Sequence, residues 1–308
     1  MNHKSRTEQP LSRALSRYLL WAILPTLLVV RGISKPVLQH IKLLNYNPPS
    51  EVSQLATQAN MSDEGRKVFY LATPTIEAQK VGLKLCTSSD AEKTITMGCY
   101  VSGKGIFIQK VTDQRLDGTM QVTAAHEMLH AVYHEHLSGS ERTEIDRELL
   151  QVFDNLNNPR LKKLIQIYRD RTPSHVSSEL HSFLGTEVAN LGPKLEQHYG
   201  RYFSDRTKLV AMAQQKNQLF AGIENKAGGI DQQLKTLRIQ IINRENTLRQ
   251  MSSASLETED QKRLYKAHVD ALHEETEYYN QLVGIYNGLS SEGSALNDSL
   301  QNVSTAEK

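Results

Sequence analysis

The stretch from residue 119 to residue 137 contains His126-Glu127-Met128-Leu129-His130 and constrains the fold more than any other. Its alanine, leucine and methionine residues favour a helix, and no proline or glycine interrupts it. Positions four apart share one face of a helix, so the two histidines can bind one metal ion. Glu127 points about 100° away, where it is free to act as a general base on a water. A chance match in a histidine-containing helix is the alternative.

A catalytic zinc ion needs a third protein ligand and an open position for water. His136 has the spacing of the last histidine in one zinc-binding pattern, but that pattern has glycine where this chain has Tyr133. His134 lies two helical turns beyond His126, about 12 Å along the axis, which favours a place at the surface or behind the ligands.

The segment 176–191 supplies stronger candidates for the third ligand. As a helix it has one apolar face, with Glu187 near the middle of that face and Glu179 at its edge. A carboxylate on an apolar face is costly unless it is paired or binds a metal. We predict that Glu179 is the ligand, and that Glu187 supports a ligand histidine or is the alternative ligand. An ion pair with Arg160 or Arg171 is the other reason for such burial.

Residues 96–101 and 105–109 read as two strands joined by a Gly-containing turn, which predicts a β-hairpin just before the histidine helix. The edge strand of such a sheet can pair with an extended substrate. A purely structural hairpin is the alternative.

The two histidines and Glu127, with a glutamate in a second helix, resemble the gluzincin branch of zinc metallopeptidases, whose best-known members are thermolysin-like. The resemblance covers about residues 95–190 and implies a zincin-like α+β peptidase domain that hydrolyses peptide bonds. It implies that His126, His130 and Glu179 bind Zn²⁺ and that Glu127 takes a proton from the attacking water.

The sequence departs from the thermolysin pattern directly after the predicted third ligand. Leu180 follows Glu179 where the pattern has Asn, and Phe183 stands where it has Asp. The groups behind the ligands must therefore be built differently, and the chain is at best a distant relative. An oxyanion donor is also expected, and four side chains remain open for that role: Tyr199, Tyr202, His198 and His175.

Residues 1–35 combine a basic tail with the uncharged run 18–30. A membrane anchor with its basic end in the cytoplasm is the preferred interpretation, against a cleaved signal peptide or a buried helix. The first two interpretations agree that residues after about 35 lie outside the cytoplasm, and the preferred one makes the chain a single-pass protein of the cell membrane. That environment favours a disulfide between Cys86 and Cys99 over two free thiols.

Residues 205–289 show seven-residue apolar repeats, which predict two helices folded back as an antiparallel coiled-coil hairpin. Pairing of each helix with a partner chain, or self-association, is the alternative. The two inward rows predicted for the first helix are Phe220, Ala227, Leu234, Ile241 and Leu248, and Ile223, Ile230, Leu237, Arg244 and Met251. The two rows predicted for the second helix are Tyr265, Leu272, Tyr279 and Tyr286, and Val269, Thr276 and Val283. The polar residues 290–308 are predicted to be disordered.

The predicted fold is mainly α with a small β-hairpin or sheet. Its parts are a membrane helix in 1–35, a peptidase domain in 36–204, the hairpin in 205–289 and a tail in 290–308. A net charge of +2, from 36 basic and 34 acidic residues, gives no electrostatic reason to expect nucleic-acid binding. We predict a membrane-anchored zinc metallopeptidase acting on a peptide or protein. The alternatives are a non-catalytic envelope adaptor that works through the coiled coil, and a metal-dependent hydrolase of another substrate.

Overall fold

The computed structural model describes residues 41–77, 97–253 and 256–301, together with Val37, Gln39 and Cys86. The chain divides into two compact units at Pro49, and the second unit carries the features considered below. The predicted membrane helix in 1–35 lies outside the described residues. Among the residues that are described, none of the helices has the length and apolar character needed to cross a bilayer.

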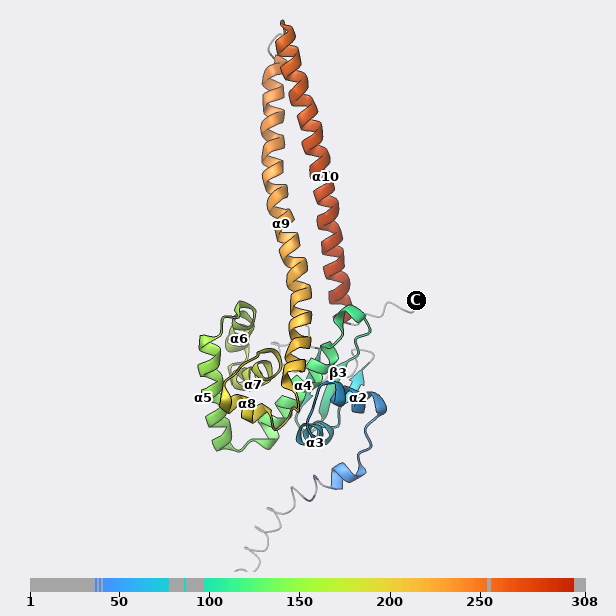
Figure 1. Ribbon diagram of the computed structural model, residues 1–308, viewed down its shortest axis with the longest axis vertical. Helices are drawn as coiled ribbons and strands as arrows, with labels where there is room; N and C mark the ends of the chain where they lie inside the picture. The colour runs from blue at the N-terminus through green and yellow to red at the C-terminus, as the bar shows by residue number, and fades with distance from the viewer. Residues whose placement is uncertain are drawn as a thin grey trace, which may run out of the picture. The chain divides into compact units, whose positions relative to one another are not determined.

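The second unit is mainly helical, with one small sheet and two long helices at its C-terminal end (Figure 1). The elements in chain order are α2 Ser50–Gln58, α3 Asp63–Leu71, β1 Thr75–Glu77, β2 Gly98–Val101, β3 Gly105–Gln109, the 3₁₀ turn η3 Gln114–Leu116, α4 Thr119–Ala131, the π-helical turn η4 Val132–His136, α5 Gly139–Asn155, α6 Pro159–Arg171, η5 Pro173–His175, α7 Val176–Glu187, α8 Pro193–Tyr199, α9 Arg206–Ser253 and α10 Glu259–Gln301.

Local capping explains where several helices begin. The Ser62 hydroxyl accepts from the Gly65 N–H at the start of α3, and Ser138 forms a reciprocal capping box with Glu141 at the start of α5. The side chain of Asn158 caps α6, whose first residue is proline. These helix starts are therefore specified by short-range hydrogen bonds.

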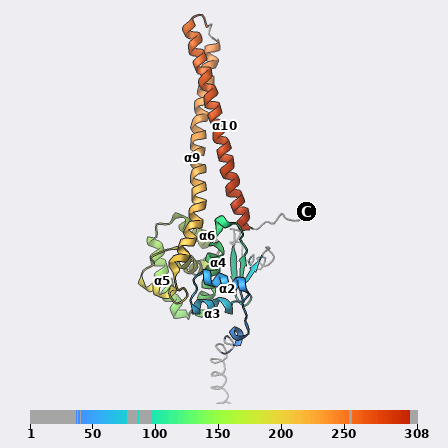
Figure 2. The same cartoon turned by 45° about the vertical axis from the view of Figure 1, so that its right-hand side comes forward.

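The hairpin prediction is confirmed: β2 pairs antiparallel with β3 across a turn at 102–104. A third strand, β1, pairs parallel with β3, so the strand order is β1-β3-β2 and β2 is an edge among the described strands. The sequence analysis missed β1 because it is three residues long and follows a helix. The sheet lies beside α2 and α4 (Figure 2). The predicted disulfide between Cys86 and Cys99 is also present, and it holds β2 to the segment before it.

Helix α7 is the centre of the helical part. It packs against α4, α5, α6 and α9. Because four helices pack against it, its buried residues include Ser178, Ser182 and Thr186 as well as apolar ones. The single apolar face that the sequence analysis expected for this segment is therefore an incomplete description. The helix also ends earlier than predicted, at Glu187.

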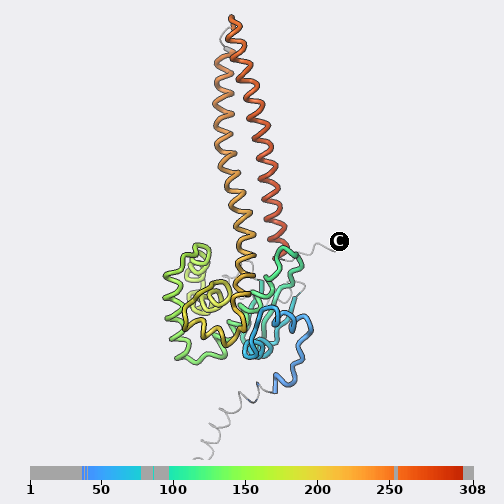
Figure 3. Tube along the Cα trace, in the orientation of Figure 1, coloured from blue at the N-terminus to red at the C-terminus, as the bar shows by residue number. Residues whose placement is uncertain are grey.

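The two long helices α9 and α10 run side by side in opposite directions, and the chain turns back at their far end (Figure 3). Both predicted rows of α9 are buried or half-buried. On α10 the predicted rows hold in part. In the first row Tyr265, Leu272 and Tyr279 are half-buried but Tyr286 is 37% exposed. In the second row only Val283 is half-buried, Val269 and Thr276 are exposed, and His268, Glu275 and Leu282 take the inward positions. Contacts with Arg244 explain why Glu275 and His268 face α9. The Arg244 guanidinium donates to both oxygens of Glu275, at 2.6 and 2.8 Å, and lies 3.1 Å from His268 Nδ1.

The prediction of disorder from residue 290 is wrong for the part of that segment which the structure describes, since α10 continues to Gln301. Its last turns are helical because Leu296 and Leu300 are buried against Leu116 at the base of the pair. The predicted boundary between 204 and 205 falls just before the first turns of α9, which are part of the core. Leu209 and Ala213, in the first turns of α9, belong to the same core as α4 and α7.

Candidate metal centre

Two glycines set the position of helix α4 and its partner α7. Gly118 begins α4 with φ of 88°, a left-handed conformation that glycine adopts without strain. Gly185 lies where α7 approaches α4, and a Cβ there would meet Tyr199 Cε1 at 2.5 Å and Leu129 Cδ1 at 2.6 Å. The absence of a side chain at Gly185 therefore lets the two helices come close enough to share one site.

The side chains of His126 and His130 on α4 meet Glu179 on α7. The two Nε2 atoms lie 3.1 Å apart. Glu179 offers one carboxylate oxygen to each ring, Oε2 at 3.5 Å from His126 Nε2 and Oε1 at 3.5 Å from His130 Nε2. Among the described residues, these three form a group whose ligand atoms all lie within 4.8 Å of one another and could hold a metal ion.

The spacing of this group suits a tetrahedral metal ion. Nitrogen and oxygen ligands about 2.0–2.2 Å from a four-coordinate zinc ion lie roughly 3.3–3.5 Å from one another. The two nitrogens lie 3.1 Å apart, and each lies 3.5 Å from a different oxygen of Glu179; with one ligand atom taken per residue, the three atoms lie within 4.8 Å of one another. Glu179 Oε2 is also buried without a hydrogen-bond partner, which is costly for a carboxylate oxygen unless a cation satisfies it. The residues therefore fit a bound metal.

Comparison of the chain with protein-family models, with curated proteins and with solved structures found no match. The resemblance to gluzincins thus stays a prediction.

Burial and charge act in opposite directions on the three groups. Burial lowers the pKa of His130 to about 3, so this ring is neutral and ready to bind a metal. Burial alone would also lower the pKa of His126, but the contact with Glu179 and the charges of the neighbouring carboxylates raise it. Burial alone would raise the pKa of Glu179, and the two histidines lower it instead.

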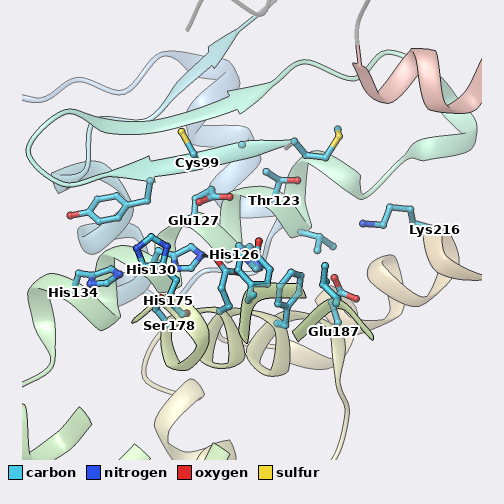
Figure 4. Close-up of a pocket in the computed structure, with 18 of the residues that line it drawn as sticks. Cys99, Thr123, His126, Glu127, His130, His134, His175, Ser178, Glu187 and Lys216 are labelled. Carbon is cyan, nitrogen blue, oxygen red and sulfur yellow. Dashed lines mark hydrogen bonds and ion pairs between the residues drawn. The ribbon is translucent and has the colours of Figure 1, made fainter. Parts of the chain in front are cut away.

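Glu127 lines the same cavity of about 450 Å³ as the three candidate ligands, beneath strand β2 (Figure 4). A Cβ at Gly98 would meet Thr123 Cγ2 at 2.6 Å, the Phe107 carbonyl at 2.8 Å and Glu127 Cγ at 3.3 Å. Only a glycine lets the edge strand lie this close to the helix. Helix α4 therefore carries two candidate ligands, His126 and His130, and the Glu127 carboxylate, and strand β2 lies over them.

Glu187, the predicted supporting residue or alternative ligand, lies outside the metal group. Its carboxylate pairs with the Arg160 guanidinium and accepts from Asn217 Nδ2 at 3.2 Å. The burial of Glu187 is therefore explained by an ion pair with Arg160, which was the alternative to a role at the metal. Glu187 still lines the cavity, at the end away from His134 (Figure 4).

The remaining histidine and tyrosine candidates separate into two groups. His134 and His175 line the cavity, with the His134 ring stacked 6.3 Å from that of His130. Three of the four candidate oxyanion donors lie outside the cavity lining. The hydroxyl of buried Tyr199 donates to the His181 carbonyl at 2.7 Å, and His198 Nε2 lies 2.8 Å from His181 Nε2. Tyr202 is buried as well and does not line the cavity. Of the four candidate oxyanion donors, His175 is therefore the one that lines the cavity. His136, considered as a third ligand, does not line it.

The cavity wall formed by α6 and α9 was not predicted from the sequence. Arg160, Leu164 and Tyr168 come from α6, and Lys216 comes from α9. The Asn-Pro pair at 158–159 signals the start of α6 and could have shown this helix. No local signal marks Lys216, because only the packing of α9 against α7 brings it to the site.

Proposed function

We propose that this protein is a zinc-dependent peptidase of the zincin type. One observation carries the proposal: His126, His130 and Glu179 bring one ligand atom each to within 4.8 Å of one another, in a cavity that Glu127 also lines. A purely structural zinc site has closed coordination and no need for a general base beside it.

His126, His130 and Glu179 would hold the ion. Zinc, when bound, supplies a Lewis acid that polarises the scissile carbonyl and acidifies water. Glu127 accepts the proton of the attacking water and passes it to the leaving amine. His175 and His134, which line the cavity with the candidate ligands, are the side chains proposed to stabilise the developing oxyanion.

Strand β2 supplies the means of holding an extended peptide. Gly98, Cys99 and Tyr100 line the cavity, and β2 has a free edge among the described strands. A substrate that adds to this edge gains main-chain hydrogen bonds and lies across the candidate metal site. The Ser102 hydroxyl donates to Glu135 Oε1 at 2.8 Å and thereby ties the hairpin to the end of the histidine helix.

The site is proposed to face an oxidising compartment, with residues 1–35 as the membrane anchor. The disulfide between Cys86 and Cys99 supports this placement, because such bonds persist outside the cytoplasm.

The adaptor function is the second candidate, and the exposed apolar side chains of the long helices favour it. Among them are Ile239, Leu264 and Ile285, at 60, 55 and 53% exposure. Such residues suit contact with a partner chain or a second copy in a coiled coil. If this were the main role, replacing Leu234 and Ile241 by Asp would abolish function, whereas Glu127→Gln would leave it unchanged.

Metal analysis of the full chain tests the proposed ligands. We expect about one zinc ion per chain in the wild type, lost in His126→Ala and Glu179→Ala and retained in Glu187→Ala. The measurement is elemental analysis of each folded variant after dialysis against zinc. A folded wild type without zinc would contradict the proposal. If Glu187→Ala lost zinc and Glu179→Ala retained it, Glu187 would be the third ligand in place of Glu179.

Glu127→Gln tests the reaction itself. We expect this variant to retain zinc and to cleave peptides about 10² to 10⁴ times more slowly, because Gln cannot accept the proton. Turnover of a peptide mixture, followed by mass spectrometry, gives the rates. Glu144→Gln, an exposed carboxylate on α5, is the matched control and should retain full activity. Equal cleavage by the wild type and Glu127→Gln would remove Glu127 from this role.

A further inference from the structure

The end of the cavity opposite His134 carries an excess of positive charge. Arg160, Lys216 and Glu187 all line it. The Glu187 carboxylate is occupied by the Arg160 guanidinium and by Asn217 Nδ2. Two cations and one carboxylate leave one net positive charge at this end.

Lys216 is the cation without a direct counterion. Within the described part of the chain, no carboxylate lies in ion-pairing distance of its ammonium, and no hydrogen bond to it is formed. Its side chain extends from α9 into the cavity toward Thr123 (Figure 4). Burial lowers the pKa of Lys216, with the nearby Glu187 charge acting in the opposite direction. A bound anion would therefore stabilise the charged form of this side chain.

The direction of strand β2 says which part of a peptide would meet this charge. The Tyr100 ring lies 6.3 Å from that of His134, so the C-terminal end of β2 is at the His134 end of the cavity. Gly98, at the start of the strand, lies over Thr123. A peptide paired antiparallel to β2, the more stable arrangement, would run from the His134 end toward Thr123 and Lys216. The residues that follow the scissile bond would then lie beside Lys216.

We infer that Lys216, next to the Arg160–Glu187 pair, forms a subsite for a carboxylate on the C-terminal side of the scissile bond. This inference rests on the proposed peptidase function and assigns its substrate class. The carboxylate belongs either to an acidic side chain directly after the cut or to the C-terminus of a peptide cut near its end. The two sources share one chemistry, since each places a carboxylate against a half-buried ammonium.

Cleavage-site profiling tests the subsite. The zinc-loaded full chain is given a peptide library with amidated C-termini, and the cuts are mapped by mass spectrometry. We expect Asp and Glu directly after the cut to be favoured over Asn and Gln by roughly tenfold. A second library with free C-termini distinguishes the sources: a preference found only there assigns the terminal carboxylate. Equal cleavage of acidic, amide and free-acid peptides would overturn the inference.

Charge reversal at one position gives the matched comparison. Lys216→Glu should shift the preference from acidic residues to Lys and Arg. Lys226→Glu has the same charge change on the same helix at an exposed position outside the cavity, and should keep the wild-type profile. Identical profiles for Lys216→Glu and the wild type would contradict the assignment.

Binding to Glu127→Gln separates this inference from the proposed reaction. Fluorescence anisotropy of the zinc-loaded Glu127→Gln chain gives the dissociation constants of labelled peptides that differ only in Glu or Gln, with free or amidated ends. Tighter binding of the carboxylate peptides, lost in Glu127→Gln with Lys216→Glu, supports the subsite even if the wild type cleaves no peptide. Cleavage without any such preference would leave the proposed function standing and remove the subsite.

Discussion

Gly98 decides how close the edge strand lies to the carboxylate of Glu127. A Cβ at this position would come within 2.6 Å of Thr123 Cγ2 and 2.8 Å of the Phe107 carbonyl. Neither neighbour is the end of a flexible chain, so the strand or the helix must shift. Such overpacking costs about 1–3 kcal/mol of stability.

We therefore expect Gly98→Ala to lower both the free energy of unfolding and the rate of peptide cleavage. Displacement of about 1 Å at a catalytic site reduces rates by roughly 10²-fold. Thermal unfolding and peptide turnover measure the two effects. Gly139→Ala, where a Cβ meets nothing within 4 Å, is the control and should match the wild type. A fully active Gly98→Ala variant would show that the spacing of β2 and α4 is not critical.

Among the elements, the pairing of α9 with α10 depends on one polar layer within an otherwise apolar seam. The side chains of Arg244 and Glu275 are 26 and 19% exposed and form a two-bond ion pair, with His268 beside them. A polar layer of this kind fixes the register of two helices, because any shift leaves the charges unpaired. The ion pair contributes less to the free energy of unfolding than to register, since two apolar side chains of similar volume can replace it without loss of stability.

A single and a double substitution in this layer should have opposite effects on stability. Arg244→Leu leaves Glu275 half-buried without its cation and should cost about 1 kcal/mol. The further change Glu275→Leu should restore the stability or raise it, while loosening the register. Denaturant unfolding gives the stabilities, and distances between spin labels on the two helices give the register. Arg263→Leu, in an ion pair whose side chains are 78 and 84% exposed, is the control with little expected effect. A double variant less stable than the single one would contradict this view.

For the whole molecule, buried histidines outside the metal group make stability depend on pH. His181 on α7 and His198 on α8 are in contact at 2.8 Å. Burial lowers the pKa of His198 to about 4 and that of His181 well below its ordinary value. The unfolded chain therefore binds protons that the folded chain does not. Stability from this pair is complete above about pH 6.5 and is lost as the pH falls toward 4.

We expect the free energy of unfolding to fall between pH 6.5 and pH 4.5, by about 1.4 kcal/mol per pH unit for each such histidine. His198→Gln can still form a hydrogen bond with His181 but cannot titrate, so its slope should be flatter. Urea unfolding at several pH values measures both slopes. His273→Gln, at a side chain 74% exposed, should keep the wild-type slope. Equal slopes for all three proteins would exclude this pair as the cause.

The sequence by itself determined the features that depend on short-range geometry. The spacing of His126 and His130, the hairpin at 98–109, the Cys86–Cys99 disulfide and the inward rows of α9 were all predicted. The histidine spacing, the hairpin and the rows of α9 depend on helix and strand periods, which decide what shares a face. The disulfide was predicted from the expected oxidising compartment.

Only the tertiary structure decided which distant residues meet. Glu179 and Glu187 both lie buried on α7. His126 of α4 contacts Glu179, whereas Arg160 of α6 pairs with Glu187. The burial of Leu296 and Leu300 likewise keeps the end of α10 helical. Lys216 enters the cavity because α9 begins inside the core. These outcomes depend on the packing of helices far apart in the sequence, which local periodicity does not encode.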